Sequence, residues 1–285
     1  MNISIIGGDK RNLHLKTLLE KDGHTITLWG FDKLGIPSPS QNLKEALQAP
    51  IIIGPIPFIK NNKLYAPYAY KNDTDINILK NLNKNQTLIG GGLPDLVKTL
   101  NITYIDLLKN ETFVQKNALP TAEGTLAIAI QESDITIANS NIVIIGAGRI
   151  GKICEKLFAN LGANVTIVVR EPKKLDNNFA FCHQNIIQPI DKKQVTKAVL
   201  HQNMAPYLKK ADIIISTPPG EVLTKKHIPY INPNALVIDV SSQPYGVSQD
   251  IENTLRPHAL PGRMFAKTAA TYIHTEITNI LQKSI

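Results

Sequence analysis

The chain has 285 residues, of which 43% are apolar, and this is enough material for two ordinary globular domains. No apolar run reaches the ~18 residues of a membrane span, and the two cysteines, Cys154 and Cys182, form neither a C-x-x-C pair nor a zinc ligand set. The net charge of +8 comes from scattered lysines without an arginine-rich stripe, which disfavours nucleic-acid binding and is compatible with a small anionic substrate.

The N-terminal residues 1–8 lead directly into a short apolar segment, with no basic region and no cleavage site. We therefore expect no signal peptide and a cytoplasmic protein. Short apolar runs then alternate with amphipathic stretches along the whole chain, which is the pattern of βα units built around a parallel sheet. The predicted fold class is α/β.

The first domain, residues 1–118, is predicted to be a small flavodoxin-like α/β domain with about five strands. Its strands are expected at residues 3–6, 25–29, 51–53, 87–89 and 103–105, and its helices at residues 10–22, 75–82 and 94–100. An apolar face at helical spacing in residues 266–285, including Ala270, Ile273 and Ile277, predicts a C-terminal helix. We expect this segment, residues 265–285, to return and pack on the first domain.

The second domain, residues 119–264, is predicted to be a Rossmann domain with a doubly wound parallel sheet. A helix over residues 121–133, entered through Pro120, is expected to connect the two domains. A second βα series follows it. Its strands are expected at residues 141–145, 165–169, 212–216, 236–240 and near 258–260, with a helix at 149–161.

A G-x-G-x-x-G motif lies between an apolar strand and an amphipathic helix, as dinucleotide binding requires. Its glycines are Gly146 for the tight turn, Gly148 for close approach of the pyrophosphate, and Gly151 for helix–strand packing. Arg149 and Ile150 complete the predicted site, where the helix N-terminus offers a partial charge of ~0.5 to phosphate. The alternative interpretation is a tight βα turn that binds nothing.

The identity of the cofactor depends on the end of the following strand, where an acidic residue would accept hydrogen bonds from the ribose of NAD. Here Arg170 stands at that position, followed by Glu171 and, after one proline, Lys173 and Lys174. An arginine pairs well with a 2′-phosphate, so NADP is favoured, while Glu171 keeps NAD open.

Two loops at later strand ends are also expected to border the cofactor. Thr217 and Pro218 would form a rigid lip, and Ser241 or Ser242 would face the nicotinamide. In the alternative interpretation, these prolines and serines only terminate strands.

Further segments stand out at the predicted strand ends and helix starts, namely residues 5–11 (IIGGDKR), 30–32 (GFD), 119–125 (LPTAEGT), 236–244 (LVIDVSSQP), 260–262 (LPG) and 266–269 (AKTA). Together with the glycine motif they resemble the family of the dipicolinate synthase A subunit over nearly the whole chain. More distantly, the layout is similar to the two-domain D-2-hydroxyacid and alanine dehydrogenases.

This resemblance implies an enzyme that oxidises a dihydrodipicolinate-type intermediate to pyridine-2,6-dicarboxylate with NADP or NAD during sporulation. It also implies the flavoprotein-like B subunit of dipicolinate synthase as partner, and we expect the chain to form a homo-oligomer. Two alternatives stay open: an NADP-dependent oxidoreductase acting on another small carboxylate, and a non-catalytic dinucleotide-binding subunit.

A flat dicarboxylate needs cationic anchors near the nicotinamide, between the domains. The preferred anchors are Arg11, which follows Lys10 after the first strand, and Lys267, which opens the last helix beside Arg263. Thr121 is expected to line the floor of the site. Glu123 would act as a base or orient a cation, or would only favour the helix dipole from the first turn.

None of the seven histidines has an acidic partner at a readable spacing, and His258 lies nearest the predicted cleft. The sequence does not select a catalytic base, and we expect no metal site.

Overall fold

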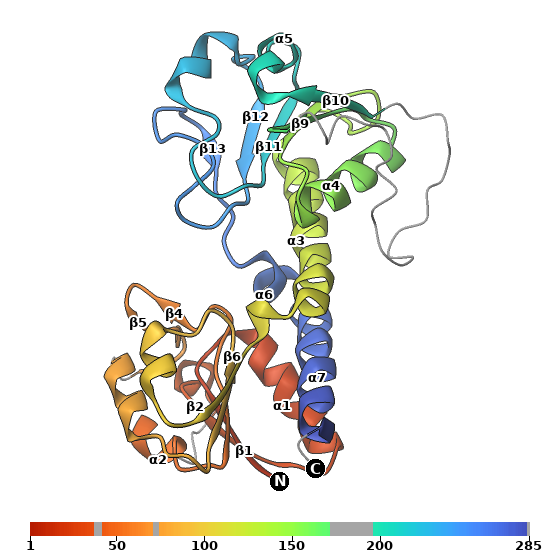
Figure 1. The fold of residues 1–285 in the computed structure, drawn as a ribbon. Coiled ribbons are helices and arrows are strands. Elements are labelled where there is room, and N and C mark those ends of the chain that lie inside the picture. The colour runs from red at the N-terminus through yellow and green to blue at the C-terminus, as the bar shows by residue number, and fades with distance from the viewer. Residues whose placement is uncertain (37–41, 71–73, 172–195, 284–285) are drawn as a thin grey trace. The chain divides into compact units, whose positions relative to one another are not determined.

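The computed structural model describes residues 1–36, 42–70, 74–171 and 196–283. The chain divides into two compact units, one formed by Met1–Asn117 with Pro261–Ile285 and the other by Ala118–Leu260. Residues 261–264, which the sequence analysis assigned to the nucleotide-binding domain, group with the first unit. Figure 1 labels the elements of both units.

The first unit is built on a five-stranded parallel sheet with the strand order β2-β1-β3-β6-β7. The strands are β1 (Asn2–Ile6), β2 (Thr25–Trp29), β3 (Ile51–Ile53), β6 (Thr87–Gly90) and β7 (Thr103–Asp106), and a small hairpin is formed by β4 (Ile59–Lys60) and β5 (Lys63–Leu64). Numbered within the sheet, the order is 2-1-3-4-5, which is the flavodoxin-like arrangement and confirms the prediction.

Two long helices cover one face of this sheet, as Figure 1 shows. They are α1 (Lys10–Lys21) and α7 (Ala266–Lys283), and they pack against each other. Their apolar faces meet in the core around Leu15, Ala270 and Ile273, so the last helix packs on the first unit.

The remaining helical segments of the first unit are short. They are α2 (Leu43–Ala46) and the 3-10 turns η1 (Asp32–Leu34), η2 (Ile76–Asn81), η3 (Asp95–Thr99) and η4 (Leu107–Lys109). The α-helices predicted over 75–82 and 94–100 are therefore wrong in type. In segments of five or six residues, the few hydrogen bonds of an α-helix do not offset the free energy that its nucleation costs. These segments form i→i+3 hydrogen bonds instead, such as that from Val97 N–H to the Pro94 carbonyl at 3.0 Å.

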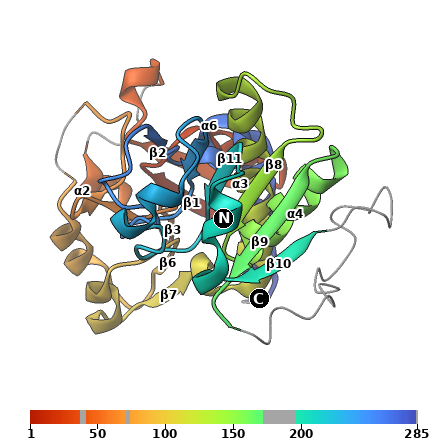
Figure 2. The ribbon, with the colours of Figure 1, turned by 90° about the horizontal axis from the view of Figure 1, so that it is seen from above.

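The second unit contains a six-stranded parallel sheet with the order β10-β9-β8-β11-β12-β13. Its elements are β8 (Asn141–Ile145), β9 (Asn164–Val169), β10 (Lys197–Leu200), β11 (Ile213–Ser216), β12 (Leu236–Asp239) and β13 (Thr254–Leu255), with helices α4 (Arg149–Asn160) and α5 (Ala205–Leu208) and the 3-10 turns η6 (His201–Asn203) and η7 (Lys225–Tyr230). The order 3-2-1-4-5-6 within the sheet is that of the Rossmann fold. In Figure 2, α4 lies along β8 and β9.

The last strand of this sheet differs from the prediction. It lies at Thr254–Leu255, and the segment predicted near 258–260 leads into the short helix α6 (Leu260–Met264). Pro257 lacks the N–H that would continue the ladder, and Ala259 has a φ of 53°, which is incompatible with a strand.

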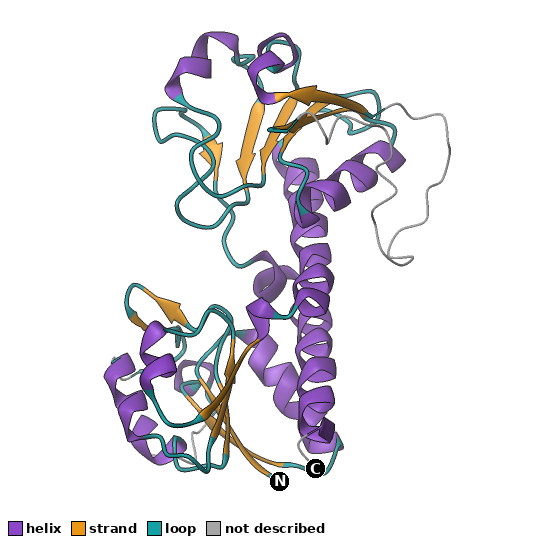
Figure 3. Ribbon diagram, in the orientation of Figure 1, coloured by secondary structure: helices purple, strands orange, loops and turns teal. Residues whose placement is uncertain are grey.

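The long helix α3 (Glu111–Glu132) begins nine residues before the predicted entry at Pro120. Its first turn is capped by Asn110, whose side-chain Oδ1 accepts a hydrogen bond from Phe113 N–H at 3.1 Å. Pro120 lies inside the helix, so the prediction that it marks the N-terminus is wrong. Figure 3 shows α3 as one continuous helix.

Because α3 starts early, Thr121 and Glu123 lie in its middle. The first-turn dipole interaction considered for Glu123 therefore does not apply, since that effect is confined to the terminal turn. The boundary between the two units falls within this helix, between Asn117 and Ala118.

Candidate dinucleotide site

The glycine motif forms the turn between β8 and α4, and two of its glycines are required by packing. Gly146 has a φ of 99°, and a Cβ on it would lie 2.6 Å from the Thr217 hydroxyl and 2.9 Å from Cδ of Pro218. A Cβ on Gly151 would overlap the carbonyl oxygen of Gly146. These residues therefore let β8, α4 and the loop after β11 approach closely, as predicted for the turn and packing positions.

The middle glycine has no such structural reason. Gly148 caps α4 with a φ of −77° and a ψ of −170°, a conformation that any L-residue adopts. A Cβ built on it would meet no described heavy atom within 4 Å. Packing in the turn requires Gly146 and Gly151 but does not require Gly148, whose structural role is only that of an N-cap residue; backbone approach by a pyrophosphate accounts for a glycine there.

A hollow of about 260 Å³ extends from this turn along the carboxyl ends of the neighbouring strands. It is lined by Ile145, Gly146, Ala147, Gly148, Val168, Val169, Arg170, Glu171, His201, Pro218 and Val222. Arg170 and Glu171 thus both lie on the same hollow as the glycine turn, so the residue that favours NADP and the residue that keeps NAD open are both placed there. Lys173 and Lys174 lie outside the described residues.

Other predicted cofactor residues are engaged in the fold itself. The Thr217 hydroxyl donates to the Ile145 carbonyl at 3.1 Å, and Ile150 packs against the core of the second unit. Arg149 is exposed in the first turn of α4. Among the described residues, none of these three lines the hollow, so their contact with a cofactor stays a prediction.

Ser241 belongs to a hydrogen-bonded cluster of polar groups after β12. Its hydroxyl donates to Oδ1 of the buried Asp239 at 2.7 Å and accepts from Gly246 N–H at 2.8 Å. The other Asp239 oxygen accepts from Val247 N–H at 2.9 Å. Ser241 therefore holds the loop in shape, and its predicted contact with the nicotinamide stays a prediction.

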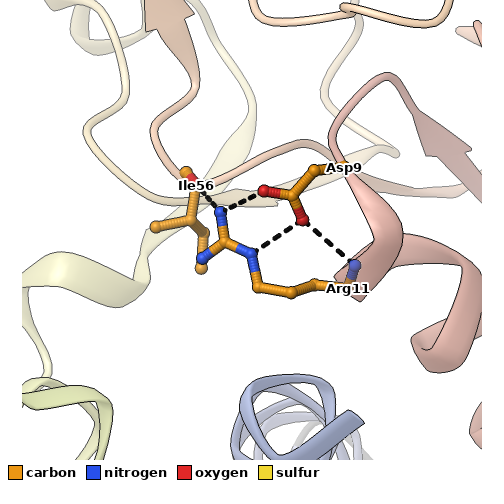
Figure 4. Close-up of polar contacts among 3 residues, drawn as sticks. All are labelled: Asp9, Arg11 and Ile56. Carbon is orange, nitrogen blue, oxygen red and sulfur yellow. Dashed lines mark hydrogen bonds and ion pairs between the residues drawn. The ribbon is translucent and has the colours of Figure 1, made fainter. Parts of the chain in front are cut away.

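In the first unit, Arg11 lies at the point where the order of the strands reverses. Figure 4 shows its contacts with Asp9 and Ile56. Its Nε donates to Oδ1 of Asp9 at 2.9 Å and its Nη2 to Oδ2 at 2.9 Å, while Nη2 also donates to the Ile56 carbonyl. Asp9 follows β1 and Ile56 follows β3, so the guanidinium bridges the two strand ends between which flavodoxin-like folds bind ligands. Among the described residues, Nη1 has no hydrogen-bond partner.

This cluster also includes the aromatic ring of Tyr65 and the start of the C-terminal segment. Burial, and then the Asp9 carboxylate, raise the pKa of Tyr65. A Cβ on Gly262 would overlap a carboxylate oxygen of Asp9, so α6 lies directly against the ion pair of Asp9 and Arg11. Lys267 is exposed in the first turn of α7. The fold thus brings Arg11 and the segment leading to Lys267 to one corner of the first unit.

The other two predicted site residues, Thr121 and Glu123, are half-buried on the part of α3 that belongs to the second unit. The histidine that sequence reasoning missed is His201, which lines the hollow of about 260 Å³ beside Gly148. Its position was hidden because the strand before it, β10, had not been recognised. The apolar residues Val199 and Leu200 were the only signal for that strand.

Cys154 is fully buried, and burial raises its pKa to about 12, so it has no nucleophilic role. In the described part of the chain, no three His, Cys, Asp or Glu side chains gather as metal ligands. Nor does any helix of that part have the length and apolarity needed to cross a bilayer.

Comparison with known proteins matches both units to family models. Residues 2–108 match the N-terminal domain of the dipicolinate synthase A subunit, and residues 114–259 match the alanine dehydrogenase/PNT C-terminal domain, which implies binding of a nicotinamide dinucleotide.

The dipicolinate synthase A subunit of Bacillus subtilis (strain 168) is 26% identical over 305 residues, covering 99% of this chain and 96% of the relative. The crystal structure of the corresponding A subunit from Bacillus halodurans superposes with a TM-score of 0.84 at 24% identity, over 98% of this chain and 97% of that one. An L-alanine dehydrogenase has a TM-score of 0.62 at 14% identity, over 99% and 89%. These two structures have the same fold as this chain.

Proposed function

The chain belongs to the family of the dipicolinate synthase A subunit, with a cofactor domain of the alanine dehydrogenase/PNT type, and on that premise we propose that it is an NADP-dependent oxidoreductase forming dipicolinate. The observation that carries the cofactor part is the open backbone at Gly148, because packing requires the other two glycines and does not require this one. Arg170 on the same hollow supports NADP over NAD, since its guanidinium matches the geometry of a phosphate.

The proposed substrate is a dihydrodipicolinate-type dicarboxylate, and the first unit supplies its anchors. Asp9 and the Ile56 carbonyl hold Nε and Nη2 of the buried Arg11, and Nη1 is the nitrogen that we propose for a substrate carboxylate. Lys267, exposed in the first turn of α7, is the proposed second cation, with Thr121 and Glu123 as the proposed lining.

Oxidation of the dihydropyridine removes a hydride from a ring carbon and a proton from the ring, and a bound NADP supplies the hydride acceptor. Because the product ring is aromatic, the step is strongly downhill and the protein needs to do little as a base. The residues named here bind and orient the substrate. None of them has to act as a general acid or base.

We further propose that the chain works in the cytoplasm of a sporulating cell as a homo-oligomer together with the B subunit of dipicolinate synthase. The relatives are named as the A subunit of a synthase, which supports a second subunit as partner. Size-exclusion chromatography with light scattering, with and without the B subunit, tests both assemblies.

The enzyme assay supplies the purified chain, alone and with the B subunit, with freshly prepared dihydrodipicolinate precursor and NADP⁺, and follows dipicolinate and NADPH together. We expect equimolar formation of both. Lys267→Ala should raise KM about tenfold or more without changing the NADP affinity, since it removes one charged hydrogen bond to the substrate.

If no dipicolinate forms and dipicolinate does not perturb the fluorescence of bound NADPH, the substrate assignment fails. Activity on another small carboxylate would change the assigned substrate but leave the assigned class of reaction unchanged. NADP binding without turnover in either assembly would identify a dinucleotide-binding protein without catalytic activity.

A further inference from the structure

His201 stands at the carboxyl end of β10, next to Arg170. Leu200 pairs with Val169 in the parallel ladder, so His201 and Arg170 are the first residues beyond two adjacent strands, which lie about 4.8 Å apart in any sheet. Both residues line the hollow that begins at Gly148. A second hollow, of about 490 Å³, again contains both of them, together with Val222.

One hydrogen bond fixes the imidazole of His201 and assigns its tautomer. Nε2 lies 2.8 Å from the Val222 carbonyl oxygen. A carbonyl oxygen only accepts, so Nε2 carries a proton in both the neutral and the charged ring. Nδ1 is then the nitrogen that is left to accept a further proton, and it has no hydrogen-bond partner among the described residues.

Among the described residues, four ionisable groups lie near this imidazole. Arg170 and Glu171 share its first hollow, Glu221 lines the second, and the ring of His227 meets it edge-on with centroids 5.6 Å apart. His227 accepts a hydrogen bond at Nδ1 from Thr224 N–H at 3.0 Å. Burial, and then the nearby His201, lower the pKa of His227.

We propose that His201 is a specificity-determining residue for the cofactor: its protonated Nδ1 donates to the 2′-phosphate beside Arg170, so that the preference for NADP over NAD increases as the pH falls. The inference rests on the proposed function, because it requires the adenosine end of NADP to lie at Arg170. The 2′-phosphate is the one group that NADP has and NAD lacks. A cation that contacts it must therefore act on the ratio of the two affinities.

Calorimetric titrations with NADP⁺ and NAD⁺ at pH 6, 7 and 8 test the proposal. Native protein should show an affinity ratio, NADP over NAD, that is about tenfold higher at pH 6 than at pH 8, which is the lower end of the range for a hydrogen bond to a charged group. His201→Gln keeps a donor near the Val222 carbonyl and cannot protonate, so its ratio should not rise. It should fall slightly, because the 2′-phosphate itself begins to gain a proton near pH 6.

Two further variants complete the test. His258→Gln removes an exposed histidine of the same unit that lines neither hollow, and it should keep the native pH dependence. Arg170→Ala should bind NADP more weakly and keep the rise in ratio toward pH 6, because His201 is still present; this variant tests the inference even if His201→Gln does not fold.

An unchanged pH dependence in His201→Gln overturns the inference and leaves NADP binding in place. An equal loss of both cofactors in that variant assigns His201 to the adenosine that they share, which also overturns it. If the native protein binds neither cofactor, the proposed function itself fails, and the inference fails with it.

Discussion

Gly148 and Gly151 stand three residues apart in one motif, and the structure predicts opposite consequences when each is replaced. Gly148→Val should fold normally and lose the dinucleotide. Gly151→Ala should damage the fold, because even one methyl group would overlap the Gly146 carbonyl oxygen in the backbone. The two variants thus distinguish a glycine needed for ligand binding from a glycine needed for packing.

The expected magnitudes follow from the local geometry. At Gly148 the backbone is extended and nothing lies within 4 Å of a built Cβ. Valine restricts the unfolded chain more than glycine does, which stabilises the folded protein by ~0.4–1 kcal/mol. Valine is also a poorer N-cap residue than glycine, which costs ~0.5–1 kcal/mol, so the two effects roughly cancel. The free energy of unfolding should therefore change by less than about 1 kcal/mol.

Cofactor binding at the same position should respond strongly. A valine side chain would block phosphate from the first-turn N–H groups of α4, which have no partner within the helix. Losing two hydrogen bonds to a charged group costs ~3–6 kcal/mol, or roughly 10²- to 10⁴-fold in Kd. In Gly151→Ala, β8 and α4 must move apart, and overpacking of this kind costs ~1–3 kcal/mol.

NADPH fluorescence titration gives Kd, and urea unfolding gives the free energy of unfolding for the native chain and both variants. The reasoning is refuted if Gly148→Val binds NADPH with native affinity. It is also refuted if Gly151→Ala is as stable as Gly148→Val.

Three other side chains have contacts that lead to predictions. Arg170→Ala should weaken NADP by roughly 10- to 100-fold and NAD much less; equal weakening in parallel titrations would exclude a 2′-phosphate contact. Arg11→Met should lower the free energy of unfolding by ~3–5 kcal/mol, because it leaves the Asp9 carboxylate buried without its partner, and Asp9→Asn combined with Arg11→Met should recover much of this loss in urea titrations. A double variant no more stable than Arg11→Met would contradict the pairing. Cys154, whose pKa burial raises to about 12, should resist iodoacetamide at pH 8 in the native protein and react after unfolding, as peptide mass spectrometry would record; native labelling would show that the thiol is accessible.

Much of the fold could be predicted from the sequence because its signals are local. The period of apolar residues marked most of the strands that form the two sheets, including β1 and β8, and the helix α7. The glycine motif marked the βα turn suited to phosphate, since glycine at these spacings reflects backbone constraints within a few residues. Parallel βα units then leave few possible sheet orders, and both observed orders are common ones.

Errors in the predicted elements arose where a local signal competed with the surroundings. Pro120 is a strong signal for the start of a helix, yet α3 continues through it. Asn110 caps an earlier start of α3, and Phe113 is buried in the apolar core of the first unit. The strand β10 was missed because its four residues carry little pattern of their own, and it is held by pairing with β9. His201 was missed with it.

The contacts of the site residues could be known only from the tertiary structure, because they include partners distant in sequence. The sequence assigned Arg11 to a substrate, but its guanidinium is shared between Asp9 and the Ile56 carbonyl, 45 residues away. His201 reaches the Val222 carbonyl, 21 residues away. The sequence gives the donors and acceptors of each side chain. The tertiary structure is needed to know which of them are occupied by hydrogen bonds within the protein and which remain available to a ligand.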